Sequence, residues 1–164
     1  MPGMEQTAFT HEDVKLLNRL ITDVEIHGGG NSDHFNALWD TGATTTCISK
    51  GVAKRLGMTP AGKCGMSHAS GFSPTNTYLA SITLPNNVKI ENIMVCEADL
   101  DSQGIGALIG MDIITKGDFA VTNRKGVTTF SFRVPSMETI DYAKKIEILN
   151  ITGTHNNKKS KKKK

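Results

Sequence analysis

Short apolar runs separated by turn residues dominate the chain, and several of them alternate between apolar and polar positions, as half-buried strands do. The first begins near Leu20 and ends at the glycine-rich run 28–33. That run indicates a hairpin turn rather than a phosphate-binding loop, because 35–39 has the pattern of a second strand and not of a helix. Two more strands are expected at 78–84 and 88–96, joined by a Pro-Asn-Asn turn. The pattern predicts an all-β, barrel-like domain.

Helical segments within this pattern are few and short. Ser49 is a favourable N-cap for a helix over 50–56, and Gly57 suits its C-terminal end. A buried strand is expected over 107–110, followed by one or two helical turns over 111–116. One or two short helices therefore accompany the strands.

The C-terminal third continues the strand pattern and then changes to a helical one. Strands over 119–122 and 127–132 should pair across the turn 123–126. Beyond them a helix is expected over 135–151, with Ser136 as its cap. Its expected apolar face contains Ile140, Ala143, Ile146 and Leu149.

These elements divide the chain into four parts. Residues 1–18 are expected to form an N-terminal extension, with a short helix over 10–13, and 19–134 to form the folded domain. The C-terminal helix of 135–151 is followed by a lysine-rich tail, 152–164. We expect this tail to be disordered, because it contains no apolar residue that could pack on the domain.

Positive charge is concentrated in that tail. Six of the last seven residues are lysines, and without these six the formal net charge of +3 becomes −3. The Lys158–Lys164 run can attract nucleic acid or another anionic surface. No aromatic residues lie among the lysines to stack on bases, so a solvated terminus is the favoured interpretation.

The cysteines and the chain ends bear on location. The chain has three cysteines, Cys47, Cys64 and Cys96, and no two of them form a CxxC motif. Because their number is odd, they cannot all form disulfides within one chain. Their odd count and wide spacing suit a reducing compartment. The N-terminus lacks the apolar segment of a signal peptide, and no apolar run approaches membrane-spanning length. A cytoplasmic protein without a membrane span is expected.

The segment with the clearest chemistry is 37–44, where an apolar strand leads directly into Asp40. Apolar flanks make ionisation of a carboxyl costly, which favours acid/base use. Thr41 supplies a hydroxyl, Gly42 allows close approach of the backbone, and Ala43 is too small to block a ligand. Taken alone, Asp-Thr-Gly is also compatible with a simple Asp-initiated turn.

A second segment, 107–114, adds weight to the first. Its Ala-Leu-Ile-Gly strand and short helix follow an expected hairpin over 65–74. Together with Asp-Thr-Gly-Ala at 40–43, it resembles the paired signatures of the retropepsin-like aspartic proteases, the family of retroviral proteases and their cellular relatives. The order, the spacing and the intervening hairpin all match, over about 20–132.

The resemblance implies a closed barrel-like β fold in which two identical subunits each contribute one Asp-Thr-Gly to a shared site. On this mapping Asp40 is the catalytic carboxylate, and Thr41 bonds across the dimer axis to the partner's backbone. Gly42 contacts the main chain of the substrate, beside Ala43.

Two further groups of residues take roles from the resemblance. The flap hairpin that covers the site would include Ser70, Gly71 and Phe72. Ile109 and Gly110 would support the active-site loop from the later strand.

Two positions depart from the retroviral pattern. Thr44 stands where retroviral members carry an acidic residue, and Met111 stands where they carry the arginine that pairs with it. Both partners are absent together, so retroviral substrate preferences do not transfer. Asp112 has no Thr-Gly after it, which favours a place at the start of the short helix over the role of a second catalytic acid.

The function expected is that of an aspartic endopeptidase, a homodimer that acts on a peptide or protein substrate with no metal and no cofactor. A catalytically inactive dimer that binds peptides is the alternative, and the intact Asp-Thr-Gly-Ala argues against it. The five histidines show no metal-ligand spacing. Cys47, in a Thr-rich strand, is interpreted as a core residue rather than a nucleophile.

Overall fold

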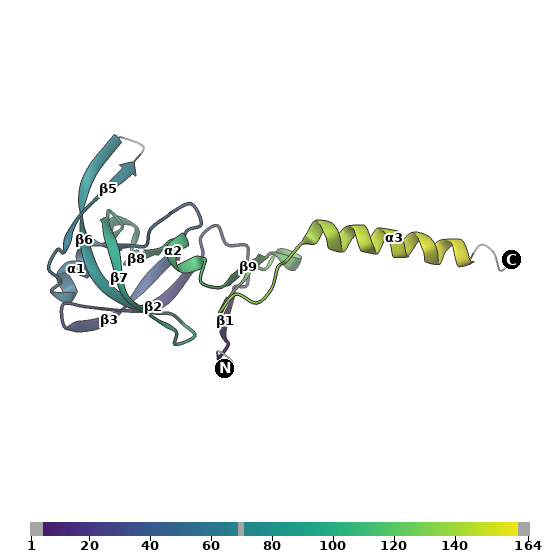
Figure 1. The fold of residues 1–164 in the computed structure, drawn as a ribbon, viewed down its shortest axis with the longest axis horizontal. Helices are drawn as coiled ribbons and strands as arrows, with labels where there is room; N and C mark the ends of the chain where they lie inside the picture. The colour runs from purple at the N-terminus through teal and green to yellow at the C-terminus, as the bar shows by residue number, and fades with distance from the viewer. Residues whose placement is uncertain (1–4, 69–70, 161–164) are drawn as a thin grey trace.

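The barrel is the largest part of the protein. The computed structural model describes residues 5–68 and 71–160 (Figure 1). Six strands follow one another around the barrel, and its first and last strands pair with each other, which closes the ring. In ring order they are β2 (Ile21–Gly28), β3 (Asn31–Trp39), β8 (Ala107–Ile109), β4 (Cys47–Ser49), β7 (Lys89–Ala98) and β6 (Gly71–Thr83). The predicted all-β, closed-barrel fold is confirmed.

The tight turn between β2 and β3 confirms the hairpin expected at the glycine-rich run. Gly29 and Gly30 both have positive φ angles, 57° and 82°. A two-residue turn with two positive φ angles matches the right-handed twist of the strands that it joins, and glycine adopts it without steric cost.

Two parallel pairings bring distant segments to one end of the barrel. β3 runs parallel to β8, so that Trp39 lies opposite Ile109. The residues that follow these two strands, Asp40 and Gly110, therefore leave the barrel side by side. β4 runs parallel to β7 next to them and places Cys47 opposite Cys96.

A hairpin arm extends beyond the barrel (Figure 1). β5 (Gly62–His68) pairs with the first part of β6, in register from Gly62 opposite Thr77 to His68 opposite Gly71. We call these paired strands, 62–68 and 71–77, the flap arm. It occupies the place where the sequence predicted a hairpin over 65–74, and its residues 69 and 70 lie outside the described part of the chain.

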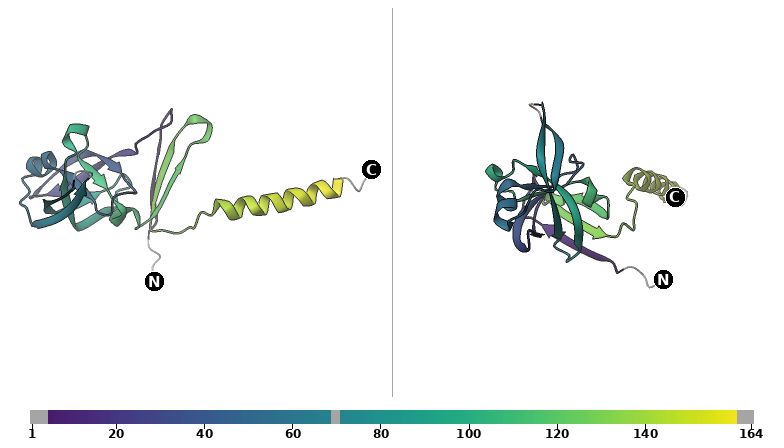
Figure 2. Two further views of the ribbon diagram at one scale, coloured as in Figure 1. Left: turned by 90° about the horizontal axis from the view of Figure 1, so that it is seen from above. Right: turned by 60° about the vertical axis from the view of Figure 1, so that its left-hand side comes forward.

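A second, smaller sheet stands beside the barrel (Figure 2). It has the order β1 (Thr7–Glu12), β10 (Thr129–Val134) and β9 (Asp118–Thr122). The short helix expected over 10–13 is wrong, because this segment pairs with β10 as β1. The pairing packs the partly buried Phe9 against Phe130, with ring centroids 5.4 Å apart, and this tertiary contact outweighs the weak helical signal of the segment.

An aromatic cluster joins the small sheet to the barrel. Trp39, at the end of β3, lies with its ring centroid 5.0–6.1 Å from four phenylalanines: Phe9, Phe119, Phe130 and Phe132. Its indole Nε1 donates to Thr22 Oγ1 at 2.8 Å, which satisfies the one polar group of a buried ring. The residue directly before Asp40 is thereby fixed from two sides.

The short helices form where the sequence predicted them. α1 (Lys50–Leu56) is capped by Ser49, whose Oγ accepts from Val52 N, and ends at Gly57, whose φ of 68° is left-handed. α2 (Met111–Ile114) follows β8. Two 3₁₀ turns, Asp101–Gln103 and Arg124–Gly126, complete the loops.

The last helix differs from its predicted bounds. α3 spans Tyr142–Ser160 and runs away from both sheets (Figures 1 and 2), whereas a helix over 135–151 and a disordered tail were expected. Ser136 does not cap it, because its hydroxyl donates to Asp118 Oδ1 at 2.6 Å. Asp141 takes that place, with Oδ1 accepting from Lys144 N at 2.9 Å. No helix in the described residues is long and apolar enough to cross a membrane.

The cysteines are arranged differently from the expectation. Cys64 and Cys96 form a disulfide between segments 32 residues apart, while Cys47 is free and buried. Sequence spacing could not reveal this pair, since strand pairing alone brings β5 close to β7. The wide spacing therefore no longer argues for a reducing compartment.

Candidate active site

The Asp40 loop begins where β3 leaves the barrel. Asp40 N donates to Ile109 O at 3.0 Å, so the first residue of the loop is still held by the neighbouring strand. Gly42 N then donates to Asp40 Oδ1 at 2.8 Å, and Ala43 N donates to Asp40 O at 3.2 Å. These bonds fold the loop around its own carboxylate and orient it. Asp40 is half-buried, whereas Thr41 and Gly42 are exposed.

The turn after β8 supports this loop from behind. Met111 N donates to Ala43 O at 2.8 Å, and Asp112 N donates to Thr44 O at 3.2 Å. Gly110 lies so close that a Cβ at its position would be 2.8 Å from Thr45 C, closer than such atoms approach. Only glycine therefore allows the two segments to lie in contact here.

A buried hydroxyl completes the support. Thr46 is fully buried, and its Oγ1 accepts from Gly110 N at 3.1 Å and donates to Asp112 Oδ1 at 2.6 Å. Thr46 N also donates to both oxygens of the same carboxylate, at 3.1 and 3.0 Å. Asp112 further accepts from Ile113 N at 3.0 Å, in the first turn of α2. Its carboxylate thus joins the end of the Asp40 loop to the start of α2.

A cavity of about 450 Å³ opens beside the Asp40 carboxylate. It is lined by the Asp40 loop, by β4, β7 and β8, and by the flap arm: Asp40, Gly42, Ala43, Thr44, Thr45, Cys47, Gly65, Cys96, Ala98 and Leu108. The structure therefore brings Asp40, Gly42 and Ala43 together at one cavity, with the flap arm on its wall.

Other residues singled out in the sequence lie elsewhere. Thr41 is exposed beside the cavity, and Ile109 and Gly110 lie behind the loop rather than on the cavity wall. Gly71 and Phe72 belong to β6 in the flap arm, opposite His68 and Ser67. Ser70 lies outside the described residues.

The sequence reasoning missed several cavity residues. Thr45 and Cys96 carry no motif of their own, Gly65 was placed only within a broad hairpin, and Leu108, although part of the Ala-Leu-Ile-Gly segment, was given no role at the site. Period-two alternation could have placed Leu108 and Cys96 on the face opposite the core residues Ile109 and Val95, but the parallel pairing of β3 with β8 and of β4 with β7 is what brings them to Asp40.

Cys47 lines the same cavity as a protonated thiol. Burial raises its pKa to about 11, and the negative charges of Asp112 and Asp40 add to the effect. Its Sγ donates to Thr45 O at 3.4 Å. A thiol held protonated is a poor nucleophile, which agrees with its interpretation as a core residue.

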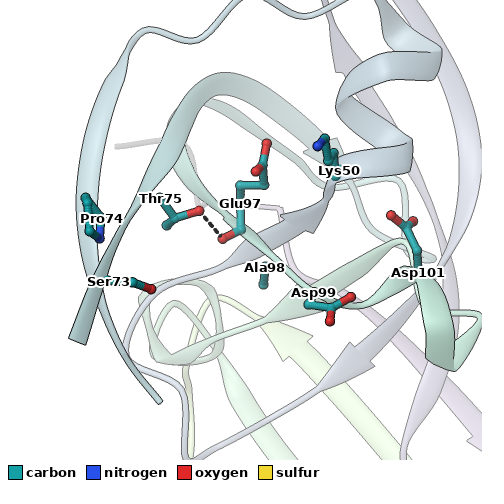
Figure 3. Close-up of a pocket in the computed structure, with 8 residues that line it drawn as sticks. All are labelled: Lys50, Ser73, Pro74, Thr75, Glu97, Ala98, Asp99 and Asp101. Carbon is teal, nitrogen blue, oxygen red and sulfur yellow. Dashed lines mark hydrogen bonds between the residues drawn. The ribbon is translucent and has the colours of Figure 1, made fainter. Parts of the chain in front are cut away.

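Figure 3 shows the residues that line a second cavity, of about 320 Å³. It shares Ala98 with the lining of the first cavity. It lies between the flap arm and the end of β7. Its lining contains three carboxylates, of Glu97, Asp99 and Asp101, and one lysine, Lys50. The other lining residues are Ser73, Pro74, Thr75 and Ala98. Thr75 Oγ1 donates to Glu97 O at 2.9 Å across this cavity wall. The bond ties the base of the flap arm to β7.

Comparison with known proteins agrees with this geometry. Residues 22–116 match the family model described as "gag-polyprotein putative aspartyl protease". No curated protein matches the chain.

Several solved structures are similar in fold. The retropepsin-like aspartic protease from Rickettsia conorii is 15% identical, with 82% of this chain and 98% of that chain covered and a TM-score of 0.46. EIAV protease, complexed with the inhibitor HBY-793, is 24% identical, with 62% and 90% covered and a TM-score of 0.46. The protease of simian foamy virus (mac) is 20% identical, with 56% and 89% covered and a TM-score of 0.39. The matched family segment spans more than half of the chain and includes both the Asp40 loop and the β8 turn, so the chain belongs to the gag-type, retropepsin-like aspartic protease family.

Proposed function

We propose that the protein is an aspartic endopeptidase, active as a homodimer in which Asp40 of each subunit supplies one of two facing carboxylates. Two carboxylates about 3 Å apart cannot both ionise cheaply, so they share one proton and titrate as a pair. The ionised carboxylate takes a proton from a bound water, which attacks the scissile carbonyl. The protonated carboxylate donates to the developing oxyanion. The water adds across the peptide bond, and an acid and an amine leave.

The observation that carries this proposal is the position of Asp40. Its carboxylate is oriented by Gly42 N at the mouth of a cavity that has the flap arm on its wall. An extended peptide can lie between a loop of this kind and the flap arm. The exposed Thr41 hydroxyl is available to a second copy of the loop.

The test is the substitution Asp40→Asn in the full-length chain. The amide keeps an oxygen that can accept from Gly42 N, but it cannot act as a base, so turnover of a fluorogenic peptide library should fall by a factor on the order of 10³ or more. The control is Asp13→Asn, at the end of β1, where the backbone N–H donates to Thr128 O and the side chain does not line the cavity. Unchanged turnover in Asp40→Asn would refute the role of Asp40.

The inactive, peptide-binding dimer is not favoured, because such a module has no need of an oriented carboxylate at its cavity. Peptide binding with no hydrolysis in the wild-type protein, across a broad range of pH, would reverse that preference. Binding of nucleic acid through Lys158–Lys164 and a cytoplasmic location both stay predictions. Binding through the tail should weaken steeply with salt and vanish when the tail is removed.

A further inference from the structure

The disulfide joins two strands that are not neighbours in the sheet. Cys64 lies on β5 opposite Thr75, and Cys96 lies on β7 opposite Thr77, so the bond crosses over β6. In a flat sheet, strands that are two positions apart are separated by about 9–10 Å. The two Cα atoms are only 6.5 Å apart. The flap arm is therefore curled over β6 toward β7 at this point.

The bond stands at the wall of the cavity that contains Asp40. Cys96 and Gly65, the residue after Cys64, both line that cavity. Within the described residues, β5 pairs with β6 alone and is the last strand of its sheet. The disulfide is thus a covalent link from the outer strand of the flap arm directly to the barrel.

We propose that the Cys64–Cys96 disulfide is a redox-controlled tether, which holds the flap arm over the Asp40 cavity and slows access of peptides to it. Cys64 and Cys96 are positioning residues in this sense and do not touch the reacting atoms. The regulatory part of the inference rests on the proposed protease function, whereas the tether itself does not. Release of the bond frees β5 and the part of β6 that pairs with it to move away from β7, while β6 from Thr77 onward stays paired with β7.

The chemistry of release is ordinary thiol–disulfide exchange. A dithiol reductant attacks the sulfur of Cys64, which is half-buried, in preference to that of Cys96, which is 8% exposed. This breaks the protein disulfide and forms a mixed disulfide with the reductant. The second thiol of the reductant then displaces Cys64. Two electrons and two protons pass to Cys64 and Cys96, and the reductant leaves as its own disulfide.

The third cysteine does not interfere with this exchange. Cys47 is the strand neighbour of Cys96, and it could compete for that sulfur if it were a thiolate. The buried surroundings that keep it protonated suppress such an attack. When a mild oxidant then accepts two electrons and two protons from the thiols, the bond re-forms between the same pair, Cys64 and Cys96.

The first measurement needs no protease activity. The full-length wild-type chain is prepared in two forms, one oxidised and one treated with dithiothreitol. Alkylation and mass spectrometry establish the state of each cysteine, and hydrogen exchange of the backbone amides is then measured in both forms. Reduction should accelerate exchange in β5 severalfold and leave β10 unchanged. A failure of the bond to form under a mild oxidant, or identical exchange of β5 in both states, would overturn the tether.

The second measurement tests regulation. Reduction should raise kcat/KM for a peptide substrate severalfold, mainly through KM. Cys64→Ser should behave like the reduced wild type in the presence and absence of dithiothreitol, whereas Cys47→Ser should keep the response to it. Faster exchange of β5 with an unchanged kcat/KM would refute regulation and keep the tether. Absence of peptidase activity in every form would instead refute the proposed function.

Discussion

Thr46 and Asp112, which are 66 residues apart in the chain, are joined by three hydrogen bonds: two from Thr46 N and one of 2.6 Å from its hydroxyl. Thr46 lies at the end of the Asp40 loop, and Asp112 lies in the first turn of α2. The retroviral pattern that the sequence resembles has an acid and an arginine at the positions of Thr44 and Met111. In this chain the connection is made by Thr46, two residues after Thr44, and by Asp112, one residue after Met111.

Removal of that hydroxyl should loosen the Asp40 loop. Thr46→Val keeps the volume but leaves Gly110 N without its acceptor in a buried site, which costs about 1–3 kcal/mol of stability. We expect a lower free energy of unfolding and a lower kcat at similar KM. Thr46→Ser is the matched variant, since it keeps the hydroxyl and loses a methyl group. Equal kcat in both variants would show that the hydroxyl is not what orients the loop.

Gly110→Ala should displace the Asp40 loop. Its Cβ would lie 2.9 Å from Thr45 O and 3.0 Å from Ala43 O, and both are backbone atoms that cannot rotate away. A shift of the loop by about 1 Å can reduce turnover on the order of a hundredfold. In the control Gly126→Ala, a Cβ meets nothing within 4 Å, but φ is +80°, so only stability should fall. Full activity in Gly110→Ala would contradict the close packing described.

Stability should depend on pH through Asp118. Hydrogen bonds from Ser136 Oγ and Met137 N, and then the bond from Arg133, lower the pKa of this carboxyl from its ordinary 3.8. The unfolded chain therefore binds the proton first as pH falls. The stabilisation is present in full above about pH 4 and is lost progressively below it. Denaturant titrations between neutral pH and about pH 3 should show this decline in the wild type and a smaller decline in Asp118→Asn.

Activity should belong to the dimer. One chain supplies one Asp-Thr-Gly, whereas the proposed chemistry uses one carboxylate as base and another as acid. Specific activity should fall on dilution, and excess Asp40→Asn chains should suppress wild-type activity under conditions of subunit exchange. Thr41→Ala should weaken the dimer by about 0.5–1.5 kcal/mol for each bond lost. A fully active monomer in sedimentation experiments would refute the shared site.

Much of the barrel could be predicted from local sequence patterns. The caps of α1, the Gly29-Gly30 turn and the strand before Asp40 follow from capping preferences, positive φ angles and alternation. β1 and the disulfide could not be predicted in this way, because both depend on partners more than 30 residues away. The start of α3 was misplaced because the hydroxyl of Ser136 is bound to Asp118, 18 residues earlier, and does not cap the helix.

The site shows the same division. The Asp-Thr-Gly-Ala segment marks its loop unambiguously once the β8 segment is considered with it. Part of the cavity wall comes from residues with no motif of their own, such as Cys96 and Ala98. The place of these two residues is set by the parallel pairing of β4 with β7, which are distant in sequence, and the pattern of a single strand does not encode which neighbour it takes.

The pairing of β1 with β10 has a consequence for how the domain can be joined to other polypeptides. Thr7 lies directly opposite Val134, so the backbone enters and leaves the folded unit at a single point on its surface. Opposed residues of antiparallel strands have Cα atoms about 4.5–5.5 Å apart. The unit could therefore be inserted into a surface loop of a host protein without separating the host strands on either side of that loop. A short linker between Thr7 and Val134 would likewise permit circular permutation, with new termini placed elsewhere in the barrel.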